Sequence, residues 1–204
     1  VLLTACDEHQ DFPDTAMKVG HILCTDGKTM SYEDYQASGK QAIAVVFSIN
    51  QREEMEGKGY AVYLWDIAPK AFADSTGVSQ KTSADLSAYD GNANTFALYS
   101  AKNVRSPLAM SVVDLWRYGQ SAYIPSVAQM RLLYLAKDAI NPLILKCGGT
   151  PIPDEDDDSW YWTSTEVEGQ ETAKAWLYSL GSGAIQETPK GQPHKARPII
   201  TIHD

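Results

Sequence analysis

Short apolar runs, separated by polar segments that contain glycine, occupy the first third of the chain, and this pattern predicts β-strands. The runs cover residues 19–24, 42–49 and 60–65. The second run is apolar at almost every position, which is typical of a strand buried on both faces. Asp26-Gly27 predicts a tight turn directly after the first strand.

Apolar residues at helical spacing follow a loop-rich insertion over residues 69–105, in which small and polar residues outnumber large apolar ones. Ser106-Pro107 supplies an N-cap and a first helical position, so a helix is expected there. Ser126 and Gln129 form a capping-box pattern for a second helix. Asn141-Pro142 predicts the start of a third, short helix.

Strand patterns return after an acidic loop over residues 151–159. The expected strands cover residues 160–165, 175–180, 184–188 and 196–202. Strands followed by helices and then by strands indicate an α+β fold and not alternating α/β units. The chain has 204 residues, of which 44% are hydrophobic and 10% aromatic, and this suits a single domain over residues 19–204.

Residues 1–18 are expected to lie outside that domain. Leu3-Thr4-Ala5-Cys6 resembles the bacterial lipobox, in which the cysteine is lipidated. The resemblance implies that residues 1–5 are the tail of a signal peptide, that Cys6 carries the lipid, and that a polar tether follows. The protein is then expected in the bacterial cell envelope. The lipid would anchor it to the outer membrane, and this position allows exposure at the cell surface. The alternative is an ordinary apolar strand at the amino terminus.

Acidic residues outnumber basic ones, with 26 Asp and Glu against 17 Lys and Arg, which gives a net charge of -9. This balance argues against a nucleic-acid partner, for which a basic surface is expected. It also argues against electrostatic attraction to anionic lipid. The sequence has no apolar run of about 18 residues, so the lipid on Cys6 is the only membrane contact expected.

A set of short motifs follows one another in the second half of the chain. They are Tyr123-Ile124-Pro125-Ser126, Gly148-Gly149, residues 160–166 (WYWTSTE), Ala175-Trp176 and Ala196-Arg197-Pro198. Their order resembles the collagen-like-adhesin carboxy-terminal domain family of bacteria, in which the motifs are roughly YLPS, GG, YWSSTE, AW and VRPV. The resemblance covers most of the chain and is loose between residues 50 and 105.

That family belongs to the C-type-lectin-like fold. The resemblance implies a small twisted antiparallel sheet with two main flanking helices and long loops, in which the first and last strands pair. Relatives include adhesins, fimbrial tip proteins and formylglycine-generating enzymes, so the fold alone does not fix the function. The formylglycine-generating enzymes need reactive cysteines near the carboxy terminus, whereas the last cysteine here is Cys147. The sequence also lacks GxSxG, HExxH and P-loop motifs, so an enzyme is not expected.

The motif residues have a structural interpretation. Trp160, Trp162 and Trp176 alternate with smaller or polar residues, so they are expected to face one side of the sheet and fill the core. Glu166 ends the first of these strands, and Arg197 lies in the last motif. We expect these two side chains to form a buried or half-buried ion pair.

Asp154, Asp156 and Asp158 alternate like the opening of an EF-hand loop. Ser159 and Thr165 stand where that loop needs glycine and glutamate, so a solvated acidic loop is favoured over a calcium site. No cofactor is therefore expected, and calcium is kept as a weak alternative.

Cys24 and Cys147 could form a disulfide in an oxidising compartment. The alternative is two separate buried thiols.

The resemblance places the ligand surface on loops and strands near the carboxy terminus. The candidate ligand-binding residues are Tyr178, Gln186, Glu187, Lys190, Gln192, His194 and Lys195. Aromatic and polar side chains suit a contact surface, although each could equally belong to an ordinary solvated face. The expected function is recognition of a glycan or protein partner. The alternatives are a structural or fimbria-associated envelope protein that binds only assembly partners, and an enzyme with an unrecognised site.

Overall fold

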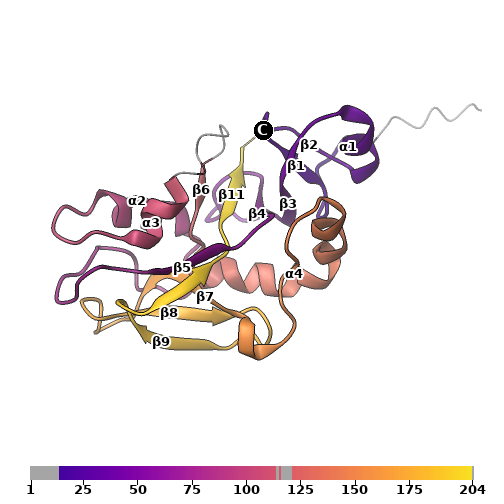
Figure 1. Ribbon diagram of the computed structural model, residues 1–204. Coiled ribbons are helices and arrows are strands. Elements are labelled where there is room, and N and C mark those ends of the chain that lie inside the picture. The colour runs from indigo at the N-terminus through magenta and orange to yellow at the C-terminus, as the bar shows by residue number, and fades with distance from the viewer. Residues whose placement is uncertain (1–13, 114, 116–120, 204) are drawn as a thin grey trace, which may run out of the picture.

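A six-stranded antiparallel sheet forms the centre of the computed structural model, which describes residues 14–113, 115 and 121–203 (Figure 1). The strand order is β2-β1-β3-β4-β11-β6. These strands are β1 (Ile22–Cys24), β2 (Thr29–Met30), β3 (Ala42–Ile49), β4 (Gly59–Tyr63), β6 (Ala122–Tyr123) and β11 (Ile199–Ile202). Cys6 and the predicted lipobox lie outside the described residues.

Two smaller antiparallel sheets complete the strands of the described part of the chain. A three-stranded sheet contains β7 (Trp160–Glu166), β8 (Lys174–Ser179) and β9 (Ile185–Pro189), and a two-stranded ribbon joins β5 (Ile67–Ala71) to β10 (Pro193–Ala196). Figure 1 shows β7, β8 and β9 at the lower edge of the view, with β5 above them. Because β10 contacts β7, the ribbon covers part of the three-stranded sheet.

The helices pack around these sheets, so the fold is α+β. They are α1 (Tyr32–Ser38), α2 (Gly91–Ser100), α3 (Pro107–Val113) and α4 (Val127–Lys146), with a 3-10 turn at η2 (Asp156–Asp158). Helix α4 packs against β3 and also contacts β7 and β8, while α2 and α3 contact each other and β6. Figure 1 shows α2 and α3 at one end of the molecule and α4 across its middle.

Strand β3 confirms the doubly buried strand expected over residues 42–49. Alternate residues of β3 enter two different hydrophobic clusters: Val46 packs in the cluster that contains Trp162, and Val45 in the cluster that contains Leu133 of α4. Both faces of the central sheet are therefore covered, which explains why a polar residue is missing from most of this strand.

Helix α4 begins at the predicted capping box. The Ser126 hydroxyl accepts a hydrogen bond from the Gln129 amide, and the Gln129 side chain accepts one from the Ser126 amide. The separate third helix is wrong, because Pro142 lies inside α4 and the helix continues to Lys146. Asn141 does not cap a new helix; its side chain exchanges two hydrogen bonds with the backbone of Ile152, at 2.8 and 2.9 Å.

The predicted pairing of the first and last strands is also wrong. Strand β1 pairs with β2 and β3, whereas β11 pairs with β4 and β6. The β3–β4 hairpin lies between them and separates the two terminal strands. The expected insertion over residues 69–105 contains α2, and it contributes Phe72, Leu98 and Val104 to the core.

Candidate ligand-binding site

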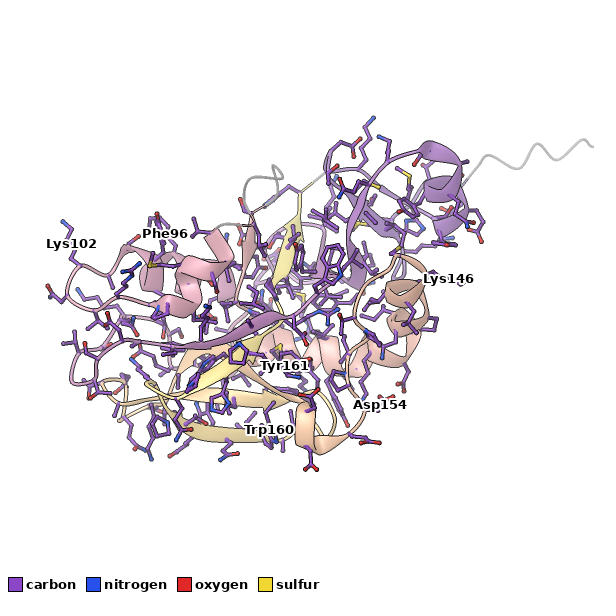
Figure 2. The ribbon with its side chains drawn as sticks, in the orientation of Figure 1. Phe96, Lys102, Lys146, Asp154, Trp160 and Tyr161 are labelled. Carbon is purple, nitrogen blue, oxygen red and sulfur yellow. The ribbon has the colours of Figure 1, made fainter. Side chains whose placement is uncertain are left out.

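A pocket of about 330 Å³ lies where the β5–β10 ribbon meets the three-stranded sheet. Four of the predicted ligand-binding residues line it together: Gln186, Gln192, His194 and Lys195. Trp160 at the start of β7 forms part of the wall, and Figure 2 labels it beside the strands of the three-stranded sheet. We call this cavity the ribbon pocket.

Strand register explains why these side chains meet. Leu177 of β8 is paired with Trp162 on one side and with Gln186 on the other. Directly paired residues of antiparallel strands point to the same face, and Trp160 shares that face because it lies two residues from Trp162. The ribbon is held over this face by a hydrogen bond of 2.9 Å from the Trp162 indole to the Lys70 carbonyl.

His194 forms an uncharged polar wall of the ribbon pocket. Its ring meets the ring of Trp162 edge-on, with centroids 5.3 Å apart, and its Nε2 lies 3.3 Å from Oε1 of Gln192. Partial burial lowers the pKa of His194 below its usual value of 6.5. The imidazole is therefore neutral at pH 7, with one nitrogen able to donate and the other able to accept a hydrogen bond.

Lys195 fixes one end of the ribbon pocket. Its ammonium lies 2.8 Å from Oδ1 of Asp158, donates to the Asp158 carbonyl, and sits 4.6 Å from the centre of the Tyr161 ring. These contacts tie the η2 turn to strand β10. The charge of Lys195 is matched by Asp158, and the rest of the wall includes aromatic, amide and imidazole groups together with the exposed carboxylate of Asp157.

The other three predicted residues lie elsewhere. Glu187 is next to Gln186 on β9 and so points to the opposite face of the sheet, where its carboxylate lies 3.4 Å from Nζ of Lys174. Tyr178 is only 3% exposed and packs against the ring of Tyr134. Its burial raises the pKa of its hydroxyl to about 12. Side chains alternate between the two faces of β8 and β9. Residues that were predicted to form one surface therefore lie on opposite faces of the sheet.

Lys190, predicted at the surface, is fully buried and forms an ion pair with the equally buried Glu166 at 3.4 Å. Its ammonium also donates to the Glu171 carbonyl and lies over the ring of Phe72. Desolvation lowers the pKa of Lys190, and the charge of Glu166 opposes that shift. The ion pair explains how a lysine can be buried here.

Glu166 therefore does not pair with Arg197, and that prediction is wrong. Its carboxylate accepts hydrogen bonds from the backbone of Gln80 and Thr82 and from the Ser79 hydroxyl. This pattern anchors the segment 79–82 to β7.

Arg197 instead lies against the segment that follows β4. Its guanidinium donates to the carbonyls of Tyr63, Leu64 and Thr150, at 2.6–2.9 Å, and forms an ion pair with Asp66 at 3.0 Å. The side chain is fully buried, so it acts as a hydrogen-bonding centre that joins two backbone segments, residues 63–64 and Thr150, to β10 and β11.

The three tryptophans do not share one face. Trp162 is buried in the cluster of Val46, and Trp160 packs at the edge of that cluster. Trp176 packs against the other cluster, because it is one residue away from Leu177 and therefore points to the opposite side of β8. The role of Trp160 in the ribbon pocket was not predicted, although its position beside a polar loop was a usable signal.

The acidic loop pairs with lysines. Asp154 lies 3.2 Å from Nζ of Lys137, and Asp158 is held by Lys195. Among the described residues, no three His, Cys, Asp or Glu side chains gather as metal ligands. Asp154 and Asp158 thus each pair with a lysine through Oδ1, and the side chain of the third candidate, Asp156, lies outside the described residues.

Cys24 and Cys147 are free thiols, which corrects the disulfide that was considered for them. Burial raises the pKa of both thiols, and each packs with the same hydrophobic cluster. We predict that a digest of the unreduced protein, alkylated in denaturant, yields both cysteines carrying the alkylating group in separate peptides. A peptide pair joined through Cys24 and Cys147 would contradict this assignment.

No protein-family model matches the chain, and no curated protein matches it. Within the described residues, no helix is both long and apolar enough to cross a membrane. The case for a function therefore depends on the geometry of the sites.

Proposed function

We propose that the protein is a binding module of the bacterial cell envelope that recognises a glycan through the ribbon pocket. The observation that carries the proposal is the meeting of a half-exposed tryptophan, two glutamine amides and a neutral histidine around one cavity. The C-type-lectin-like fold, the adhesin family and the lipid anchor on Cys6 belong to the same proposal.

The chemistry of the pocket wall suits a sugar. A pyranose ring presents a flat face of C–H groups, which can stack on the indole of Trp160 while the polar edge of the indole stays solvated. Its hydroxyl groups both donate and accept hydrogen bonds, as do the amides of Gln186 and Gln192 and the neutral imidazole of His194. A few placed polar groups beside an aromatic surface are the usual composition of a small-ligand site.

The charges of the pocket wall argue against an anionic ligand. Asp157 and Asp158 both line the pocket, and the ammonium of Lys195, the cationic side chain of the wall, is already bound by Asp158. An anionic ligand would have to break this pair and approach Asp157, whereas a neutral sugar would leave the pair intact.

We predict that Trp160→Ala weakens glycan binding at least about 10-fold, because aromatic anchors at the centre of an interface contribute on the order of 2 kcal/mol or more. The measurement is a glycan and mucin array on the domain from Asp14 onward, followed by calorimetry on the sugars that bind. Trp65→Ala is the matched control, since Trp65 is a tryptophan 38% exposed outside this pocket.

The array is run with calcium and with chelator. We expect the same signal in both buffers, because Asp154 and Asp158 are engaged by lysines. A blank array in both buffers, or equal losses in Trp160→Ala and Trp65→Ala, would reject the ribbon pocket as a glycan site.

A further inference from the structure

A groove of about 1310 Å³ lies along the side of α4 that faces away from the core positions Met130 and Leu133. Its floor is helix α4, and its walls are the loop 85–90 and the turn between β8 and β9. We call it the α4 groove. It is about four times the volume of the ribbon pocket and exceeds the usual size of a small-molecule site.

Helix α4 carries a second apolar stripe that lines this groove. Ala128, Leu132 and Leu135 follow one another at helical spacing of four and three residues, with Arg131 beside them. Leu132 also packs at the edge of the core cluster that contains Met130 and Leu133, whereas Leu135 is exposed. A surface helix normally directs its apolar stripe at the core, so Leu135 is the apolar residue of this face that is left uncovered.

Three exposed apolar side chains line this groove. Leu135 is 70% exposed on the floor, Leu86 is 42% exposed on one wall, and Ile185 is 37% exposed on the other. Scattered single apolar residues are ordinary on a surface, but a contiguous group of them marks an interaction site.

A smaller hollow continues the groove, since both are lined by Asp85 and Leu86. Its other walls include Trp176, Glu168 and Glu187. The described residues that line this end include three carboxylates and no lysine or arginine. The Glu187 carboxylate is already paired with Lys174, so Asp85 and Glu168 supply the further negative charge of the hollow that Trp176 lines. An aromatic ring beside carboxylates is a favourable place for an ammonium or guanidinium group.

From this combination we infer that the α4 groove and its acidic end form a docking surface for a segment of a partner protein. The segment carries large apolar side chains, which cover Leu135, Leu86 and Ile185, and a lysine or arginine that reaches Trp176. The acidic end determines the sign of the partner's charge, because carboxylates repel both an acidic peptide and an anionic lipid surface. This surface is separate from the ribbon pocket and does not depend on the proposed glycan binding.

The test uses a random library of 12-residue peptides displayed on phage and panned against the full chain. We expect the enriched peptides to share apolar residues and at least one lysine or arginine. The best peptide is then synthesised with a fluorophore, and its dissociation constant is measured by anisotropy. Replacing its basic residue with glutamate is expected to weaken binding at least about 10-fold.

Matched variants locate the peptide on the protein. Leu135→Asp and Trp176→Ala are each expected to raise the dissociation constant at least about 10-fold. Phe96→Asp is the control for the first, because Phe96 is 64% exposed on α2, outside the groove. Trp160→Ala should leave peptide binding unchanged, which separates this inference from the glycan proposal.

Four results would overturn the inference. The first three are a library without enrichment, enriched peptides that lack basic residues, and a loss of binding in Phe96→Asp as large as in Leu135→Asp. A fourth is a dimer by sedimentation that Leu135→Asp dissolves, since a second copy of the chain would then occupy the groove.

Discussion

Arg197→Met is expected to lower the free energy of unfolding by about 3–5 kcal/mol, as for the removal of one partner from a buried ion pair. The substitution keeps an unbranched apolar stem but removes every donor of the guanidinium. It leaves the carbonyls of Tyr63, Leu64 and Thr150 without that donor and removes the charge that faces Asp66. Each buried group left unsatisfied costs on the order of 1–3 kcal/mol. The Leu64 carbonyl keeps its hydrogen bond from the Thr150 amide, so the main losses are expected at the other carbonyls and at Asp66.

The measurement is equilibrium unfolding in urea, followed by tryptophan fluorescence. Lys174→Met provides the control, because Lys174 and Glu187 form an ion pair in which both side chains are more than a third exposed. Such pairs contribute about 0–1 kcal/mol. If Arg197→Met were no more destabilising than Lys174→Met, the guanidinium would not be the centre of this network.

Lys190→Met is expected to be similarly destabilising, by about 3–5 kcal/mol, because it leaves the carboxylate of Glu166 buried without a counter-charge. Glu166→Gln has its own cost, since it weakens the hydrogen bonds to the backbone of Gln80 and Thr82. The double variant Glu166→Gln/Lys190→Met should be more stable than the sum of the two losses predicts, by about 0.5–3 kcal/mol.

The same double-mutant analysis distinguishes the observed pairs from the predicted one. Glu166→Gln combined with Arg197→Met should give losses that add to within about 0.5 kcal/mol, because the two side chains have different partners. Strong coupling between Glu166 and Arg197, together with additivity for Glu166 and Lys190, would reverse the assignment of partners.

Local signals in the sequence predicted local structure well. The uninterrupted apolar run at residues 42–49 became β3 with the same bounds, and Ser126 with Gln129 started α4. Helix α1 also has such signals, an N-cap at Ser31 and a left-handed C-cap at Gly39. These features depend on residues within one turn or one strand of each other.

Long-range pairing was not predictable in this way. Glu166 meets backbone groups 84 and 86 residues away, and Arg197 meets Asp66 across 131 residues. Nothing in the spacing of these charges says which one faces which, because the choice is made by the order of strands in three sheets. The sheet order also placed Lys190 inside the protein, although lysine is almost never buried unless paired.

The sequence predicted which segment of the chain carries the candidate site, but not which side chains of that segment lie on the same surface. Strand β9, strand β10 and the loop between them do bring Gln186, Gln192, His194 and Lys195 together, although the two strands belong to different sheets. Strand alternation sends Glu187 to the opposite side of the sheet, where it joins the acidic end of the α4 groove. The sequence could not reveal the ribbon pocket itself, because β5 covers it from more than a hundred residues earlier in the chain.

The position of β11 inside the central sheet has a consequence for the timing of folding. Strand β11 bridges β4 and β6, and its three isoleucines belong to the core. Until residues 199–202 have been synthesised, one edge of β4 has no partner strand. Arg197, which binds the carbonyls of Tyr63 and Leu64, is synthesised only two residues before β11. At about 5–20 residues per second, synthesis of the earlier strands takes seconds during which this sheet stays incomplete. A chain built in this order therefore leaves the edge of β4 unpaired and the core contacts of the three isoleucines unmade until its last strand is synthesised.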